Sequence, residues 1–207
     1  RDEDTVKRLI GSLEKEYGKK RTGIHVSDLT LCLRESYFRK VEPRQLTQRE
    51  LGFFVDGARR HSVIEGLHGA RREVAVEAYG VKGTVDFIEE GGEQIPVEIK
   101  STRWLKDEIP PHYLRQLSYY MVLLGVKRGK ILVQNINAKE GEPIFVCHNV
   151  ELTEREFEDV FMEMDGRRLK LNRALDHKDW RGLPVAFEAW KCKGCPQKEV
   201  CFGESII

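Results

Sequence analysis

Hydrophobic residues recur at helical spacing over the first third of the chain. The first such pattern covers residues 2–17, where apolar side chains at helical intervals predict an amphipathic helix. A second helix is expected to begin at Ser27, as its N-cap, and to end before Pro43. A third pattern predicts a helix over residues 47–69. The N-terminal part of the protein is therefore expected to be helical.

Shorter apolar runs in the middle of the chain predict β-strands. The expected strands cover residues 73–79, 83–89, 95–101, 130–137 and 143–147. Gly91 and Gly92 lie between the second and third of these strands and predict the turn of a hairpin.

Two further helices are expected among and after these strands. One begins at the proline pair at positions 110–111 and continues to about residue 124, and the other covers residues 152–175. Thr153 and Glu156 have the spacing of a capping box, which is typical of a helix N-terminus. The tail after Pro184 is expected to be irregular. This order of elements predicts an α/β fold with a mixed central sheet flanked by helices.

Composition and charge narrow the class of protein. The 207 residues suit one domain with a sizeable core, and 40% hydrophobic with 33% charged residues is typical of globular proteins. The net charge of +1 gives no overall electrostatic attraction to nucleic acid, so any such binding depends on local groups. No apolar run approaches the roughly 18 residues of a membrane span, and no signal peptide is visible. We expect a cytoplasmic protein without a membrane partner.

Carboxylates interrupt the apolar pattern of the predicted hairpin. In a hairpin centred on Gly92, Asp86 of one strand lies opposite Glu98 of the other. Facing like charges destabilise a sheet, and a divalent cation would offset that cost. Lys100 shares a strand face with Glu98, where it would help deprotonate a metal-bound water or stabilise charge developing on a phosphate. The plainer alternative is an exposed Glu-x-Lys ion pair without catalytic meaning.

Two helical motifs supply further candidates. His61 shares an inward stripe with Phe54 on the predicted third helix and would join the carboxylates as a ligand that favours Mn²⁺. On its own, it would more simply be a core histidine. Gln116 and Tyr120 are neighbours one helical turn apart, and would orient a nucleotide or hold Lys100 in place. A buried polar pair at the edge of the core is the alternative.

The cysteines suggest a metal site. The count of five argues against a disulfide framework in a cytoplasmic protein. Cys192, Cys195 and Cys201 form a C-x2-C-x5-C pattern, and Cys32 is the candidate fourth ligand, since zinc and iron–sulfur clusters both favour four thiolates. Cys147 ends a predicted strand and is expected to be a small buried hydrophobic residue. Unrelated cysteines remain the alternative.

Taken in order, these motifs resemble the iron–sulfur branch of the RecB-like nucleases of the PD-(D/E)XK superfamily. The order is Cys32, Gly57-x3-His61, Gly83-Thr-Val-Asp86, Glu98-Ile-Lys100, Gln116-x3-Tyr120, and then Cys192, Cys195 and Cys201. In size the chain is most similar to the CRISPR-associated Cas-four exonucleases. Val85 stands where the superfamily's eponymous proline precedes the first acid, a departure common in this branch.

The resemblance implies a restriction-endonuclease-like core, with an iron–sulfur region that joins the N-terminal helices to the C-terminal tail. It implies one nuclease domain over residues 1–207, made of a helical segment 1–45, a core 46–150 and a C-terminal part 151–207. The implied catalytic residues are Asp86, Glu98 and Lys100. The implied ligands of Mg²⁺ or Mn²⁺ are His61, Asp86, Glu98 and the backbone carbonyl of Ile99.

The resemblance also implies further groups and partners. A cluster, 4Fe–4S ahead of 2Fe–2S, would be held by Cys32, Cys192, Cys195 and Cys201, and Gln116 and Tyr120 would contact DNA. The implied substrate is single-stranded DNA, or DNA ends with overhangs, trimmed for the CRISPR integrase. A homo-oligomer is compatible with the resemblance. Three alternatives stay open: a stand-alone repair or viral RecB-like exonuclease, an inactive cluster-stabilised DNA-binding module, and a zinc-stabilised structural protein.

Overall fold

A mixed β-sheet forms the centre of the fold in the computed structural model, which describes residues 3–17, 21–43, 46–67, 71–89, 92–105, 108–186 and 189–203. Within these residues the sheet has six strands in the order β1-β3-β4-β5-β6, with β2 also paired to β3. The strands are β1 Ile24–His25, β2 Arg71–Ala78, β3 Val81–Glu89, β4 Ile95–Thr102, β5 Arg128–Asn135 and β6 Phe145–Glu151. The expected α/β fold with a mixed sheet is confirmed.

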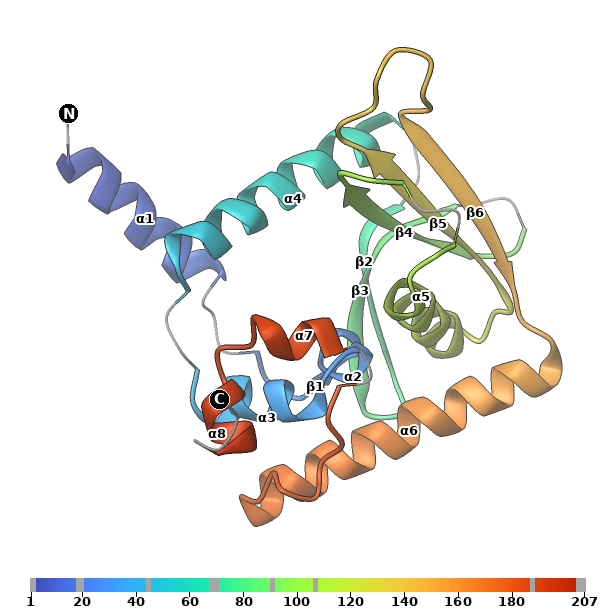
Figure 1. Cartoon of the computed structure of the whole chain (residues 1–207). Helices are drawn as coiled ribbons and strands as arrows, with labels where there is room; N and C mark the ends of the chain where they lie inside the picture. The colour runs from blue at the N-terminus through green and yellow to red at the C-terminus, as the bar shows by residue number, and fades with distance from the viewer. Residues whose placement is uncertain are drawn as a thin grey trace.

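Helices surround this sheet unevenly. They are α1 Glu3–Tyr17, α2 Val26–Thr30, α3 Leu33–Val41, α4 Gln48–Leu67, α5 Pro111–Leu124, α6 Glu154–His177, α7 Ala189–Lys193 and α8 Lys198–Phe202. Figure 1 shows α5 against the sheet with α6 running past it, while α4 reaches from α1 to the strands on the other side. The C-terminal α7 and α8 lie close to α3. None of the described helices combines the length and hydropathy that a membrane span requires.

The two central strands separate part of the way along their length. β3 and β4 are antiparallel neighbours only from Glu89–Ile95 to Phe87–Val97. Beyond that pair, β4 continues in parallel with β5, while the start of β3 pairs in parallel with β1. The sheet therefore opens at Asp86, the residue directly before the last paired position of β3. This opening determines where the predicted acidic residues of β3 and β4 lie.

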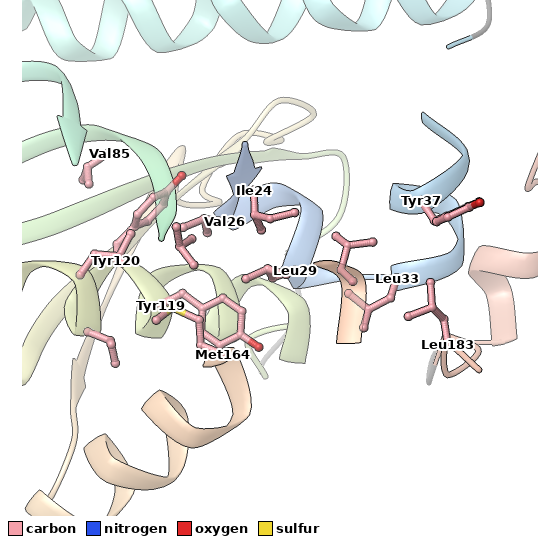
Figure 2. Packing of buried hydrophobic residues seen from close by; sticks show 14 of the residues in the cluster. Ile24, Val26, Leu29, Leu33, Tyr37, Val85, Tyr119, Tyr120, Met164 and Leu183 are labelled. Atoms are coloured by element: carbon pink, nitrogen blue, oxygen red, sulfur yellow. The ribbon is translucent and has the colours of Figure 1, made fainter. Parts of the chain in front are cut away.

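The main hydrophobic core lies between the sheet, α5, α6 and the α2–α3 pair. Figure 2 shows Leu29 next to Tyr119 and Met164, Leu33 near Leu183, and Tyr120 nearer the strands. Residues 117–123 of α5 are buried without interruption, because this helix contacts the sheet, α2 and α6 at once. The core thereby fixes α5 against β3 and β4, which matters because α5 carries two of the predicted site residues.

The start of the second predicted helix differs from the sequence-based expectation. The N-cap of α2 is His25 and not Ser27, so that prediction was wrong. The His25 backbone N–H donates to the Asp28 carboxylate at 2.9 Å, which closes the first turn of the helix. His25 is also the last residue of β1, and a two-residue strand leaves no hydrophobic pattern from which the earlier helix start could be predicted.

The second predicted helix is also interrupted. It consists of α2 and α3, with a break at Leu31, where one continuous helix was expected. Arg167 of α6 donates from Nε to the Leu29 carbonyl at 2.6 Å and from Nη2 to the Leu31 carbonyl. These contacts satisfy carbonyl groups that a terminating helix leaves without partners. The break leaves Cys32 as the N-cap residue of α3.

The remaining boundaries agree with expectation to different degrees. The capping box of α6 is confirmed, since the Thr153 N–H donates to Glu156 at 2.8 Å and the Glu156 N–H donates to Thr153 at 3.3 Å. β6 begins and ends later than predicted, and the tail expected to be irregular contains α7 and α8. Gly91 of the predicted turn lies outside the described residues.

Two predicted burials were wrong. Phe54, expected on an inward stripe of α4, is 47% exposed, because α4 projects away from the main core and packs with only part of its length against the strands. Cys147, expected to be buried, is exposed in the middle of β6. β6 pairs with β5 along one edge, and its side chains alternate between half-buried and exposed positions.

Candidate active site

The predicted acids meet at the opening between β3 and β4. Asp86 and Glu98 are the next residues after the last paired position, Phe87–Val97. The Ile99 backbone N–H donates to Asp86 Oδ2 at 2.7 Å, so the aspartate carboxylate occupies the place of a strand partner. Ile99 itself is fully buried, and Glu98 is only 2% exposed. The structure therefore brings a buried Glu98 and a half-buried Asp86 to the opening between the two strands.

Lys100 is held at this edge by two side chains. Its ammonium Nζ donates to Glu98 Oε1 at 2.5 Å and to Gln116 Oε1 at 3.0 Å. The same Nζ lies 5.2 Å from the ring centroid of Tyr113, which allows a cation–π contact. The Lys100 side chain is 18% exposed, so its tip still reaches solvent. The Glu98–Lys100 pair is not the exposed strand ion pair considered as the plain alternative.

The surrounding charges determine the protonation of Lys100. Burial on its own lowers the pKa of Lys100, but the contact with Glu98 and the nearby Asp86 carboxylate raise it by more. The net result is a pKa above the ordinary value of lysine. In this arrangement Lys100 is a cation that donates hydrogen bonds.

Gln116 and Tyr120 stand behind Lys100 on α5. Gln116 accepts the hydrogen bond from Lys100, and its Nε2 lies 3.5 Å from the Tyr120 hydroxyl. Tyr120 is 4% exposed, and burial together with the charges of Glu98 and Asp86 raises the pKa of its phenol. A neutral phenol is thus fixed beside the amide. Of the two roles predicted for this pair, the contacts favour holding Lys100 in place.

Gly83 makes room for this arrangement. A Cβ atom at Gly83 would lie 2.6 Å from Tyr120 Cε1 and 3.2 Å from Val26 Cγ2, well inside normal contact distances. Only glycine lets the tyrosine ring pack directly on β3, three residues before Asp86. The sequence analysis gave Gly83 no role of its own, although a glycine inside a strand is a signal for close approach of another group. Tyr113 was also missed, because nothing in its spacing connects it to Lys100.

The available donors suit a hard divalent cation. Asp86, Glu98 and the Ile99 carbonyl all offer oxygen ligands, which Mg²⁺ and Mn²⁺ favour. Two carboxylates and one ammonium leave a net negative charge at this edge, which also favours a cation. Within the described residues no three His, Cys, Asp or Glu side chains form a complete site. The side chain of His61 lies outside the described residues, but α4, which carries it, contacts both β3 and β4.

The four candidate cluster cysteines come from two ends of the chain. Burial raises the pKa of the Cys192 thiol, and the proximity of Cys32 and Cys201 adds to this shift. Burial raises the pKa of Cys195 as well, with a contribution from Cys32. In the part of the chain that the structure describes, no three of these thiols are close enough together to form a ready metal site.

Arg34 connects the same two regions. From α3, its Nε donates to the Leu183 carbonyl at 2.7 Å, and its Nη1 lies 3.4 Å from both the sulfur and the carbonyl oxygen of Cys201. The N-terminal helices and the C-terminal tail are thus joined by direct hydrogen bonds. This contact was not predicted, because a single arginine on a helix carries no sequence signal for a partner 167 residues away.

A mixed sheet that opens at an aspartate, beside a buried Glu-x-Lys pair, defines an α/β protein of the nuclease class. Residues 15–202 match the sequence profile of the PD-(D/E)XK nuclease superfamily, and the chain belongs to this superfamily. None of the curated proteins matches the sequence.

Solved structures share the fold at low sequence identity. The protein SSO0001 is 19% identical, with a TM-score of 0.64 and 97% of each chain covered. An alkaline exonuclease from Laribacter hongkongensis, LHK-Exo, is 11% identical, with a TM-score of 0.52 over 81% of this chain and 95% of its own. Its complex with dAMP is similar, with 13% identity and a TM-score of 0.50 over 75% and 91%. At these identities the likeness shows the fold, and two of these neighbours are structures of an exonuclease.

Proposed function

We propose that the protein is a metal-dependent exonuclease that hydrolyses phosphodiester bonds at the ends of single-stranded DNA. The observation that carries this proposal is the set of Asp86, Glu98 and Lys100 at the opening of the sheet. The Glu98–Lys100 ion pair and the Asp86–Ile99 hydrogen bond place two carboxylates beside a single ammonium, which leaves one negative charge that a divalent cation would balance. A second acid at this edge is explained by a cation that both acids bind.

Each residue has a definite part in this proposal. Asp86, Glu98, the Ile99 carbonyl and His61 would hold Mg²⁺ or Mn²⁺. The ion, when bound, supplies Lewis-acid activation of the phosphate and a water nucleophile at neutral pH. Lys100 donates a hydrogen bond to the phosphate oxygen on which negative charge accumulates.

Gln116 and Tyr120 act in this scheme as positioning residues. Gln116 fixes the direction of the Lys100 ammonium through the 3.0 Å hydrogen bond, and Tyr120 fixes the Gln116 amide. Lys100 has a long flexible stem, so a second anchor besides Glu98 restricts where its charge lies. The sequence-based suggestion that Gln116 and Tyr120 touch DNA directly is retained as part of the proposal, through the side of α5 near Lys100.

The preference for chain ends is supported by the family resemblance and by the structural similarity to the exonuclease LHK-Exo. The direct test uses linear and circular single-stranded DNA of the same sequence with Mg²⁺ or Mn²⁺. An exonuclease degrades the linear strand stepwise and leaves the circle intact. Cleavage of the circle at a similar rate would instead establish an endonuclease and overturn this part of the proposal.

We further infer that Cys32, Cys192, Cys195 and Cys201 hold an iron–sulfur cluster, 4Fe–4S ahead of 2Fe–2S. The Arg34 contacts between α3 and the tail support this inference, because they hold the Cys32 and Cys201 segments together. Anaerobically purified protein should contain iron and sulfide and absorb visible light. Cys195→Ala should lose both signals, whereas Cys147→Ala, which changes an exposed cysteine of β6, should keep them. A colourless protein containing zinc would favour the zinc-stabilised alternative.

The biological setting proposed here is the trimming of DNA ends with overhangs for the CRISPR integrase, as the resemblance to the Cas-four exonucleases implies. A stand-alone exonuclease is the second candidate, favoured by the similarity to LHK-Exo. Adding integrase to a trimming reaction separates them. The first candidate predicts that overhang removal stops at a defined length in its presence, and the second predicts unchanged degradation. The mass of the free protein in solution tests the proposed homo-oligomer.

A further inference from the structure

A pocket of about 330 Å³ lies next to the candidate active site and is not used by the chemistry above. It is lined by residues from the end of β4, the segment before α5, the first turn of α5, β5, β6 and α7. Aromatic rings come from Trp104, His112, Tyr113 and Trp190, and also from His148. These residues come from separate segments, so the fold and not one local motif assembles the pocket.

The pocket adjoins Lys100 through two of its lining residues, Tyr113 and Thr102. Tyr113 lines it and also lies 5.2 Å from the Lys100 ammonium. Thr102 lines it as well and follows Lys100 by two residues on β4, so the two side chains share a strand face about 7 Å apart. A single extended nucleotide spans such a distance. A group bound in the pocket would therefore be adjacent to a phosphate at Lys100.

The aromatic walls are exposed yet fixed. Trp104 is 74% exposed and Trp190 is 54% exposed, which is unusual for large apolar side chains lining one pocket. The Thr102 hydroxyl donates to the Trp104 carbonyl at 3.0 Å and accepts from its backbone N–H at 3.3 Å. The His112 ring lies 4.5 Å from that of Tyr113 and 5.8 Å from that of Trp190. The hydrogen bonds to Thr102 fix the backbone of Trp104, and the ring contacts position Trp190 beside His112.

The charge of the pocket indicates which part of a nucleotide it suits. Glu108 is among its lining residues, and a carboxylate repels phosphate but accepts hydrogen bonds from amino groups. Unpaired bases bind proteins chiefly by stacking on aromatic side chains, with little dependence on sequence. We propose that this pocket binds the unpaired nucleobase next to the scissile phosphate, by stacking on Trp104 and Trp190. This inference rests on the proposed function, since it takes DNA as the substrate.

The first test measures binding of fluorescently labelled single-stranded DNA in EDTA, so that cleavage plays no part. Loss of one stacking platform should weaken binding about 5- to 150-fold in Trp104→Ala and in Trp190→Ala. Tyr79→Ala is the matched control, because Tyr79 is 56% exposed but packs on Phe161 of α6 and does not line the pocket. Affinities of both tryptophan variants equal to that of the control would overturn the proposal.

The second test removes a nucleobase from the DNA instead of a tryptophan ring from the protein. One abasic residue is moved along the terminal positions of the strand. At a single position it should weaken binding to the wild type at least as much as either tryptophan substitution does. At that position its effect should be smaller on Trp190→Ala, which keeps the Trp104 platform, and should disappear when both tryptophans are replaced by alanine. An abasic penalty that is equal in the wild type and in Trp190→Ala would show that the base binds elsewhere.

A spectroscopic test uses the protein's own indoles. Two of its three tryptophans line the pocket, so in Trp180→Phe the indole fluorescence comes from Trp104 and Trp190 alone. Adding dAMP should quench this fluorescence, and inorganic phosphate at the same concentration should not compete. Quenching that phosphate abolishes would identify a phosphate site and refute the nucleobase assignment.

The outcomes also separate this inference from the proposed catalysis. A protein that binds DNA with the predicted abasic and tryptophan dependence, yet cleaves nothing with Mg²⁺ or Mn²⁺, refutes the catalytic proposal and supports the pocket. A protein that cleaves single strands but binds abasic and intact strands equally supports catalysis and refutes the pocket.

Discussion

Replacement of Gly83 by alanine should disturb the candidate active site from inside the core. The added Cβ would lie 2.6 Å from Tyr120 Cε1, where carbon atoms normally approach to about 3.5–4.0 Å. The tyrosine ring would have to move by about 1 Å, and Val26, at 3.2 Å, restricts the backbone from moving the other way. The Tyr120 hydroxyl is already 3.5 Å from Gln116 Nε2, so such a shift would break that contact.

The expected change in stability follows from two opposing effects. Overpacking of a buried site costs about 1–3 kcal/mol. Replacing a glycine inside a strand by alanine returns about 0.5–1 kcal/mol, because the unfolded chain loses flexibility. Gly83→Ala should therefore lower the free energy of unfolding by about 0.5–2 kcal/mol. It should also slow DNA cleavage, because Tyr120 would no longer hold the Gln116 amide, and Gln116 would then hold the Lys100 ammonium less firmly.

Urea unfolding measures the stability effect, with Gly166→Ala as the matched control. Gly166 is inside α6 with no atom within 4 Å of an added Cβ, so this change should stabilise the protein by about 0.5–1 kcal/mol. In a Tyr120→Leu background, which lacks the clashing ring atoms, Gly83→Ala should no longer be destabilising. If Gly83→Ala costs the same with tyrosine and with leucine at position 120, the proposed clash is not the cause.

Two further substitutions test other parts of the account. Arg167→Met removes the charged donor to the Leu29 and Leu31 carbonyls, so it should lower the free energy of unfolding by about 1.5–3 kcal/mol, measured in urea. Unchanged stability would show that the break between α2 and α3 does not depend on α6. Gln116→Leu removes the hydrogen bond from Gln116 to the Lys100 ammonium, so it should lower kcat with little change in KM or in the urea midpoint of unfolding. A drop in stability without a kinetic effect would instead assign Gln116 a purely structural role.

The elements that were predicted well are those whose determinants are local. The capping box of Thr153 and Glu156 fixes the start of α6 within one turn, and apolar strand runs gave β3 and β4 nearly to the residue. The break between α2 and α3 was not predictable, because its cause is Arg167, 136 residues beyond Leu31. β1 is too short to leave a pattern and is defined only by its pairing with β3.

In the candidate site, too, the residues placed by local patterns were predicted and those placed by tertiary packing were not. The facing positions of Asp86 and Glu98 follow from hairpin symmetry, and Lys100 follows from strand alternation. The pocket beside them was not predictable, since Trp104 and Trp190 are far apart in sequence and lie in segments without periodicity. Their proximity depends on how the C-terminal tail packs against the first turn of α5. Local patterns thus indicate the proposed catalytic groups, while tertiary packing determines what surrounds them.

The central claim is that Glu98 helps to hold a metal that cleaves DNA. The most direct measurement is degradation of end-labelled single-stranded DNA with Mg²⁺, with Mn²⁺ and with EDTA, comparing the wild type with Glu98→Gln. Glu93→Gln is the control, because Glu93 pairs with Arg128 away from the opening of the sheet. The account predicts metal-dependent cleavage by the wild type and the control, and a rate at least about 100-fold lower for Glu98→Gln. Cleavage by Glu98→Gln at the wild-type rate, or cleavage that persists in EDTA, would contradict it.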